Sequence, residues 1–226
     1  MKLLIILPAF NEGEKIGEVL KNLPNKIPGV SEIEKLVIDD GSSDNTAKIA
    51  LSQKAKVLRH IINRGLGGGI GTGFEYARLT GADIVVTFDS DGQHRPQDIV
   101  SLIKPIIEKK VDVVIGSRFI KVSEVPFDRI VINFLSNVAT FILFGIWTSD
   151  SQSGLRAFNK NAISKIEIKT QKMEVSSEIF KEIKRNDLKF TEIPIKAIYT
   201  EYSRKKGQKN SNAVPTFIKM FLRILR

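Results

Sequence analysis

Short apolar runs rich in Ile and Val alternate with segments of helical character through the first half of the chain. Strands that are buried on both faces read as continuous apolar runs, and parallel strands need helical connections between them. The sequence therefore predicts an α/β fold with a mostly parallel central sheet and helices on both faces. The expected strands are 2–7, 34–39, 55–60, 82–88 and 111–116, and the expected helices lie near 12–22, 44–52, 69–80 and 97–108. After residue 116 the alternation stops, so we expect the second half to be organised differently.

The size, charge and cysteine content of the chain exclude several classes of protein. A chain of 226 residues that is 42% apolar can bury a substantial core in one domain. The net charge of +10 is concentrated at the end, where residues 201–226 hold seven Lys or Arg and one Glu. That segment should seek anions, but no helix-turn-helix or RNP-like signature accompanies it, which argues against a nucleic-acid-binding protein. The absence of cysteine excludes disulfides and thiolate metal sites and fits the cytosol. The N-terminal apolar run of five residues, ended by Pro8, is too short for a signal peptide.

Acidic residues follow several of the expected strands. In open α/β sheets ligands bind beyond the carboxyl ends of the strands, and here Glu12, Asp39 and Asp89 stand at or just after such ends. Asp89 and Asp91 project the same way from an extended chain, within reach of one hard cation, and the Gln93 amide oxygen is a possible third ligand. The sequence thus predicts a Mg²⁺ or Mn²⁺ site that would bridge the protein to a diphosphate.

The glycine-rich stretch 63–73, NRGLGGGIGTG, resembles a phosphate-binding loop at first sight. It matches neither Gly-x-Gly-x-x-Gly in any register nor the Walker loop. We therefore expect its glycines to let the chain turn into a helix packed close to the sheet, beside a nucleotide pocket.

Six motifs, in order, resemble glycosyltransferase family 2 with its GT-A fold, and within it the dolichyl-phosphate mannose synthase and polyprenyl-phosphate glycosyltransferase group. They cover roughly residues 1–163. The motifs are LPAFNE (7–12), VIDDGSSDNT (37–46), NRGLGGGIGTGF (63–74), DSDGQHRPQDI (89–99), GSRF (116–119) and DSQSGLRAFNKNAI (150–163).

The resemblance implies a role for each group of motif residues. Asp91, Arg118 and Asp150 are the implied catalytic residues, with Asp150 as the general base if one is used; an acceptor that is already a phosphate needs little deprotonation. Guanidinium groups at the acceptor side suit a phosphate. The residues implied for the nucleotide sugar are Pro8, Phe10, Glu12, Asp39, Asp89, Asp91, Gln93, Arg204 and Lys209. The implied metal ligands are Asp89, Asp91 and Gln93. The residues implied for the acceptor phosphate are Arg118, Arg129 and Asn133.

Two positions depart from the family pattern. Phe10 stands where lipid-phosphate members often have Tyr, so a hydroxyl contact is lost there. In SRKKGQKNS, Lys209 and Asn210 fall where Ser and Lys are usual, which weakens the assignment of Lys209 to a basic loop over the diphosphate.

The implied reaction transfers a hexose with inversion from GDP-mannose or UDP-glucose to a polyprenyl (dolichyl-type) phosphate, at the cytoplasmic face of the membrane. A growing glycan is an alternative acceptor. A nucleotidyltransferase would also bind a metal and a nucleotide, but it would be expected to carry a basic, Gly-rich loop directly after the first strand, where PAFNE stands.

Two amphipathic segments suggest how such an enzyme meets lipid. Residues 130–149 carry no charge, yet Asn133, Ser136, Asn137 and Thr140 form one polar stripe, which favours a helix lying flat over a transmembrane span. Residues 213–226 have basic residues on an otherwise apolar helix, as interfacial anchors do. We expect a catalytic domain at 1–212, with a nucleotide-sugar half (1–116) and an acceptor half (117–212), that is peripheral at the inner membrane face. A membrane-protein partner could supply transmembrane segments.

Overall fold

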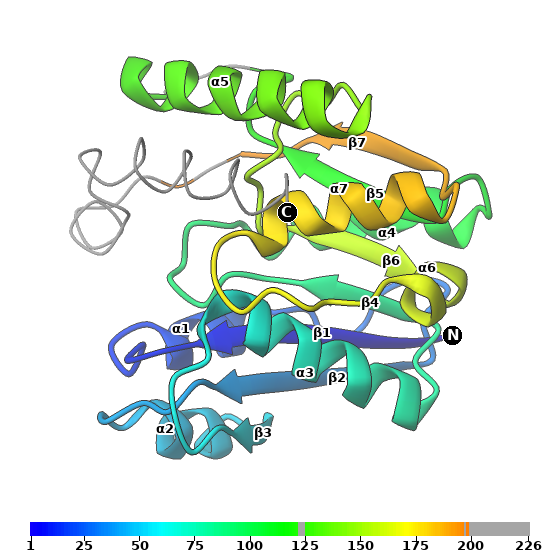
Figure 1. The fold of residues 1–226 in the computed structure, drawn as a ribbon. Coiled ribbons are helices and arrows are strands. Elements are labelled where there is room, and N and C mark those ends of the chain that lie inside the picture. Colours follow the sequence, from blue (N-terminus) through cyan, green and yellow to red (C-terminus); the bar gives the residue numbers. More distant parts are fainter. Residues whose placement is uncertain (122–124, 197, 199–226) are drawn as a thin grey trace.

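A seven-stranded sheet in the order β3-β2-β1-β4-β6-β5-β7 forms the centre of the molecule in the computed structural model (Figure 1). The structure describes residues 1–121, 125–196 and 198. The strands are β1 (Lys2–Ala9), β2 (Glu32–Asp39), β3 (Lys56–Arg59), β4 (Ile84–Thr87), β5 (Val113–Ser117), β6 (Arg156–Asn159) and β7 (Phe190–Pro194). The helices are α1 (Ile16–Asn22), α2 (Thr46–Ser52), α3 (Gly65–Thr80), α4 (Asp98–Ile107), α5 (Phe127–Phe144), α6 (Lys160–Lys165) and α7 (Val175–Arg185).

The sheet is mostly parallel, as expected from the sequence. Strands β1, β2, β3 and β4 pair in parallel, and so do β5 and β7. Only β6, among the described strands, runs against its neighbours β4 and β5. All the parallel strands therefore end at one edge of the sheet, which gathers their C-terminal loops there.

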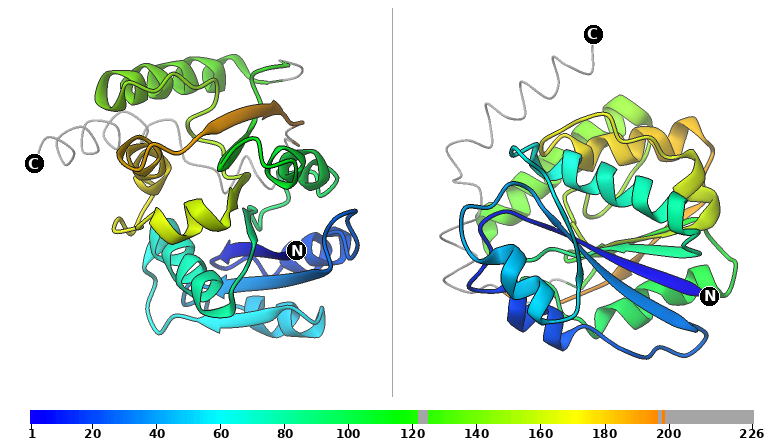
Figure 2. Two further views of the ribbon diagram at one scale, coloured as in Figure 1. Left: turned by 90° about the vertical axis from the view of Figure 1, so that its right-hand side faces the viewer. Right: turned by 90° about the horizontal axis from the view of Figure 1, so that it is seen from below.

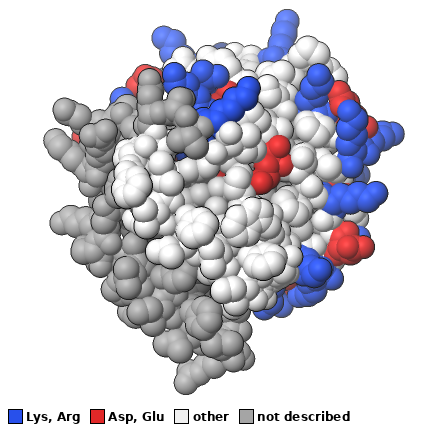
Figure 3. Space-filling view, turned by 90° about the horizontal axis from the view of Figure 1, so that it is seen from above, with Lys and Arg blue, Asp and Glu red and all other residues white. Residues whose placement is uncertain are grey.

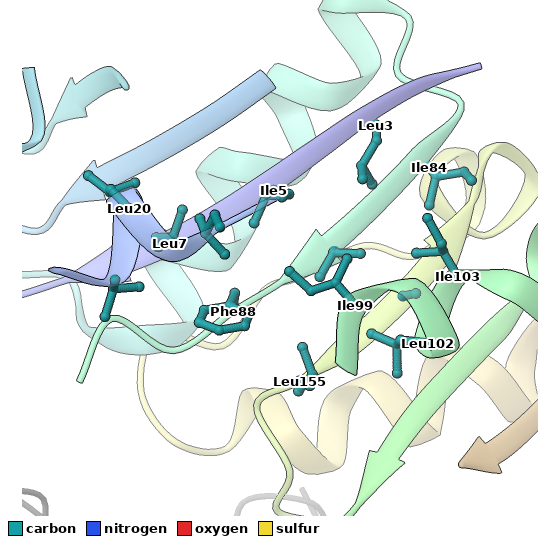
Figure 4. Packing of buried hydrophobic residues seen from close by; sticks show 14 of the residues in the cluster. Leu3, Ile5, Leu7, Leu20, Ile84, Phe88, Ile99, Leu102, Ile103 and Leu155 are labelled. Carbon is teal, nitrogen blue, oxygen red and sulfur yellow. The ribbon is translucent and has the colours of Figure 1, made fainter. Parts of the chain in front are cut away.

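Alternate side chains of β1 belong to two separate hydrophobic cores, because successive strand residues point to opposite faces of the sheet. Leu3, Ile5 and Leu7 pack with apolar residues of α1 and α4, as Figure 4 shows for part of this cluster. Leu4 and Ile6 pack on the other face with α3, α6 and α7. The helices thus cover both faces of the sheet, and Figure 2 shows the two layers edge-on.

Helix α3 begins at Gly65, four residues before the start expected from the sequence. Its first turn packs against the segment 168–172: the amides of Gly67 and Gly68 donate to the carbonyls of Lys172 and Gln171. A Cβ on Gly67 would lie 2.2 Å from the Thr170 carbonyl oxygen, so only glycine allows this approach. Backbone carbonyls of the protein therefore accept from the first amides of α3, where a phosphate would otherwise bind. This agrees with the conclusion that the stretch is not a phosphate loop.

Helix α5 lies over one end of the molecule, and its polar stripe faces inward, as expected. Asn133, Ser136, Asn137 and Thr140 are all buried. The helix ends at Phe144, and Gly145 after it takes the left-handed conformation with φ of 67°. None of the described helices is both long and apolar enough to span a membrane. The helix expected at 213–226 lies outside the described residues.

Candidate active site

The loops after β1, β2 and β4 meet at the carboxyl edge of the sheet. Pro8, the last but one residue of β1, packs on the backbone of Gly69, while Phe10 beyond the strand exposes 45% of its surface. Glu12 and Asp39 are buried nearby. The structure thus places the four residues implied for the nucleoside on two adjacent strand ends, β1 and β2.

Asp39, the last residue of β2, is fixed by two contacts. Its Oδ1 accepts a hydrogen bond from the backbone N–H of Ser42 at 3.0 Å. Its Oδ2 lies 3.2 Å from Nε of Arg59, the residue opposite it on β3. Asp40 has a different role, because its carboxylate accepts from the amides of Arg64 and Gly65 and contacts His60 Nδ1. It anchors the entry to α3, with His60 as its side-chain partner.

Asp89 is held by the His94 ring and by the backbone of Gly154. It contacts Nε2 of the buried His94 at 2.8 Å. A Cβ on Gly154 would lie 2.3 Å from both carboxylate oxygens of Asp89, so the carboxylate rests directly on the glycine backbone. Burial acts to raise the pKa of Asp89, but the charge and hydrogen bond of His94, followed by the charges of Arg118 and Arg156, hold it below its ordinary value.

Asp91 behaves in the opposite way. Burial, with the neighbouring charge of Asp89, raises the pKa of Asp91 to about 6. The amide N–H of Gln93 donates to Asp91 Oδ1 at 2.9 Å, which folds the DSDGQ turn around the two carboxylates. The repulsion between two carboxylates this close is relieved when a cation binds between them.

This donor set fits a hard divalent ion. Two carboxylates and a nearby amide supply the oxygen ligands that Mg²⁺ and Mn²⁺ take, and leave positions for substrate phosphates. No group of three or more Asp, Glu, His or Cys side chains among the described residues could hold a metal by itself. Any metal here would therefore depend on ligands from outside these residue types, as a diphosphate would provide.

Arg118 and Asp150 form a bidentate ion pair. Nε and Nη2 of Arg118 donate to the two oxygens of Asp150 at 2.7 and 2.8 Å, and the backbone N–H of Arg118 donates at 3.1 Å. Asp150 is completely buried. Two residues that the sequence assigned separately, one to the acceptor and one as a candidate base, are thus partners of each other.

The loop that carries Asp150 is clamped to α5. The side-chain amides of Asn133 and Asn137 both donate to the carbonyl of Ser149, at 2.7 and 2.9 Å, and the Ser151 amide donates to Asn137 Oδ1. The Nδ2 of Asn133, implied for the acceptor phosphate, is used in this clamp. Arg129 lies half-buried four residues before Asn133 on the same helix.

Sequence reasoning missed several residues at this edge. Arg156, on β6, is buried, donates to the Ser151 and Ser176 carbonyls, and lies over the Phe180 ring. Burial lowers its pKa to about 10 despite the charges of Asp150 and Asp89. The role of Gly154 as a support of Asp89 was also not visible, since it depends on a tertiary contact. Glu178 binds the amides of Lys169 and Thr170 and so fixes the segment over α3. Arg204 and Lys209 lie outside the described residues.

Comparisons with known proteins decide the family. The sequence profile of glycosyl transferase family 2 matches residues 4–167. The chain belongs to glycosyl transferase family 2. It is 43% identical over 230 residues to an uncharacterized protein of Methanocaldococcus jannaschii, a match that covers 100% of this chain and 92% of the relative.

Several relatives carry functional names, and two of them cover most of this chain. One is the UDP-N-acetylglucosamine–dolichyl-phosphate N-acetylglucosaminyltransferase of Methanococcus voltae, which is 38% identical over 98% of this chain and 94% of its own length. The other is the dolichol-phosphate mannosyltransferase of Pyrococcus furiosus, which is 32% identical over 86% of this chain and 56% of its own length.

Solved structures agree on the fold. Glucosyl-3-phosphoglycerate synthase from Mycobacterium tuberculosis matches with a TM-score of 0.70 and 19% identity, over 97% of this chain and 79% of that one. The GT-A fold and the enzyme class expected from the sequence, a glycosyltransferase, are thereby confirmed.

Proposed function

We propose that this family 2 glycosyltransferase transfers a hexose from a nucleotide sugar to a polyprenyl phosphate of the dolichyl type. The single observation that carries the proposal is the site itself. Nucleoside residues on β1 and β2, the Asp89–Asp91 pair after β4, and the Arg118–Asp150 pair after β5 meet at one edge of the sheet. The acceptor class is supported by the relatives, several of which are named for transfer to dolichyl, polyprenol or undecaprenyl carriers.

Donor binding divides between two regions of the site. Pro8, Phe10, Glu12 and Asp39 would line the nucleoside pocket. The diphosphate would lie over the DSDGQ turn, where Asp89, Asp91 and Gln93 would hold Mg²⁺ or Mn²⁺. The ion, when bound, neutralises the charge that develops on the departing nucleoside diphosphate. Arg204 and Lys209 remain proposed as basic residues near that diphosphate.

Arg118 is the proposed acceptor residue, and its partner Asp150 sets its position. Both oxygens of Asp150 are engaged by the guanidinium, and the carboxylate is buried, so it is poorly placed to take a proton from an acceptor. A phosphate monoester is already anionic near neutral pH and can attack without a base. Asp150 would therefore orient Arg118 toward the acceptor phosphate, with Arg129 as a second cation and Asn133 holding the loop.

The position of α5 suits an acceptor with a lipid tail. Its buried polar stripe grips the Asp150 loop, while Phe134, Leu135, Phe141 and Ile142 are exposed on the opposite side. Figure 3, which views this end of the molecule, shows a broad surface of mostly uncharged side chains, interrupted by an acidic one, with basic side chains along its upper and right-hand sides. This face is proposed to rest on the inner surface of the membrane, with an anchor at 213–226 and possible help from a membrane-protein partner.

A transfer assay tests the proposal. Purified protein is incubated with polyprenyl phosphate in detergent or vesicles, with GDP-mannose, UDP-glucose or UDP-N-acetylglucosamine, and with Mn²⁺, Mg²⁺ or EDTA. We expect one donor to yield a glycolipid that is labile to mild acid, and EDTA to stop the reaction. Transfer to a soluble glycan, or donor hydrolysis with no lipid product from any donor, would overturn the lipid acceptor.

A further inference from the structure

Glu192 lies on the edge strand β7 and contacts the loop that carries Asp150. We propose that Glu192 is a positioning residue, which fixes Arg118 and Asp150 relative to each other so that the guanidinium meets the acceptor phosphate in one orientation. The inference rests on the proposed function, because it takes Arg118 as the acceptor residue of that proposal.

The carboxylate of Glu192 accepts hydrogen bonds from two successive residues of the loop. The backbone N–H of Ser149 donates to both oxygens, at 2.9 Å to Oε1 and 3.0 Å to Oε2. The hydroxyl of buried Thr148 donates to Oε1 at 2.6 Å, and Ser149 Oγ lies 3.0 Å from the same oxygen. A carboxylate accepts and does not donate, so it can serve these three donors at once.

Thr148 extends the contact to Asp150. Its Oγ1, whose proton goes to Glu192, accepts the backbone N–H of Asp150 at 3.3 Å. The carbonyl of Ser149 is held from the other side by two asparagine side chains of α5. The backbone that leads into Asp150 is therefore held from β7 and from α5 together, which fixes the point from which the Asp150 side chain starts.

A second chain of hydrogen bonds leads to Arg118. Ser149 Oγ lies 2.6 Å from Oγ of buried Ser117, and the same Ser117 oxygen accepts the backbone N–H of Phe119 at 3.2 Å. Ser117 and Phe119 flank Arg118 in the chain. Strand β7 also pairs with β5 up to Ser117, the last residue of β5. The same carboxylate is thus linked to the backbone on both sides of Arg118.

The orientation of the Arg118 guanidinium depends on the place of Asp150, because both oxygens of that carboxylate accept from it. A shift of the loop would turn the guanidinium as well. Guanidinium recognises phosphate through two parallel hydrogen bonds, which a small misplacement weakens. The loss of Glu192 should therefore weaken acceptor binding and spare the donor residues on β1, β2 and the turn after β4.

Glu192→Gln keeps the shape of the side chain and changes its hydrogen bonding. Whichever way the amide lies, its NH₂ group faces the Ser149 N–H, which is 2.9 and 3.0 Å from the two oxygens. A backbone N–H cannot turn away from a second donor. We expect the KM for polyprenyl phosphate to rise about tenfold or more. The KM for the nucleotide sugar, and the Mn²⁺-dependent affinity for its nucleoside diphosphate, should stay within about twofold of the wild type.

Asp112→Asn is the matched control. The carboxylate of Asp112 accepts the backbone N–H of Lys189, the residue before β7, and the side-chain amides of Asn159 and Asn161. It precedes β5, at the edge of the sheet opposite to the site. Both KM values should stay unchanged in this variant, so that a rise in Glu192→Gln cannot be assigned to a general loosening of β7.

A double-variant cycle tests whether Glu192 acts through Arg118. In the Arg118→Ala background, Glu192→Gln should raise the acceptor KM by less than about twofold more, because residues that act through one contact give non-additive losses. Thr148→Val has the same shape as the native residue and removes the branch to Asp150. It should raise the acceptor KM several-fold, and it carries the test if Glu192→Gln does not fold.

The outcomes separate the inference from the function beneath it. An unchanged acceptor KM in folded Glu192→Gln, or in Thr148→Val if Glu192→Gln does not fold, overturns the inference and leaves the glycosyltransferase proposal standing. Equal rises in the donor and acceptor KM, or losses that multiply in the cycle with Arg118→Ala, have the same consequence. If the wild type transfers sugar to no polyprenyl phosphate, the proposed function fails, and the inference fails with it.

Discussion

At the scale of single residues, the carboxylates of Asp89 and Asp91 repel each other when no metal is bound between them. Asp91 has a pKa of about 6, above the 3.8 of an ordinary aspartate, because of burial and the charge of Asp89. A carboxyl whose pKa is raised by folding favours the folded state at low pH, and that contribution is lost as the pH rises from about 4 through about 6. Metal-free protein at pH 8 therefore bears the full cost of the pair.

Asp91→Asn should relieve that cost. In EDTA at pH 8 we expect the variant to have a free energy of unfolding roughly 1–3 kcal/mol higher than the wild type, and at pH 5 the gain should shrink. Urea unfolding at both pH values measures the difference. A gain that is equal at pH 5 and pH 8 would show that removal of the charge is not its cause. The variant should also fail to bind Mn²⁺, since one proposed ligand is gone.

Gly154 determines where the Asp89 carboxylate lies. Gly154→Ala puts a methyl group on atoms 2.3 Å away, and the end of a short side chain gives way more easily than backbone. We expect Mn²⁺ affinity, measured by electron paramagnetic resonance, to fall about tenfold or more, with a loss of stability below about 2 kcal/mol. Unchanged Mn²⁺ affinity would mean that Asp89 does not need its observed position.

At the scale of elements, α3 contains glycines that a close backbone contact requires and glycines that have room for a side chain. Gly67→Ala should destabilise the protein by about 1–3 kcal/mol, because the new Cβ would overlap the Thr170 carbonyl. Gly71→Ala adds a methyl at an ordinary contact distance of 3.6 Å and should be neutral or stabilise by up to about 1 kcal/mol. Denaturant midpoints measure both effects. If Gly71→Ala proves the more damaging, the close packing of the segment 168–172 on α3 is wrong.

Elements with a strong local signal could be predicted from the sequence. The apolar runs at 2–7 and 34–39 became β1 and β2 because each is buried on both faces. The start of α3 was missed by four residues, since Gly65, Gly67 and Gly68 are poor helix formers, and this turn is held by contacts with residues about a hundred positions away. Strand β6 has four residues, RAFN, and its antiparallel place between β4 and β5 leaves no periodic trace.

The residues of the site likewise divide into those that could be recognised from the sequence and those whose partners could not. Asp89 and Asp91 could be recognised because two carboxylates share one turn after a buried strand. The Arg118–Asp150 pair joins residues 32 positions apart, and the contacts of buried Arg156 come from the Ser151 loop and from α7. Local sequence reports which groups are chemically able to act, whereas tertiary structure decides which groups are paired with each other.

At the scale of the whole molecule, α5 links the proposed membrane face to the loop that carries Asp150. The stripe that holds Ser149 and Ser151 lies on one side of the helix, and exposed aromatic and aliphatic side chains lie on the other. An apolar face that rests on lipid would therefore fix the loop that carries Asp150. Contact with the membrane and the placement of the acceptor residues would then depend on the same helix.

The double variant Phe134→Ser/Phe141→Ser tests this arrangement. Each phenylalanine is about half exposed, so its removal should cost the fold little, while the loss of two apolar anchors should weaken partitioning into anionic vesicles about tenfold or more. Leu79→Ser is the matched control, because Leu79 on α3 is 85% exposed and lies outside α5. Vesicle flotation measures binding, and a short-chain water-soluble acceptor measures catalysis without a membrane. We expect the double variant to keep its rate on the soluble acceptor and to lose activity on vesicles. Equal flotation of the double variant and Leu79→Ser would mean that the face of α5 does not bind lipid.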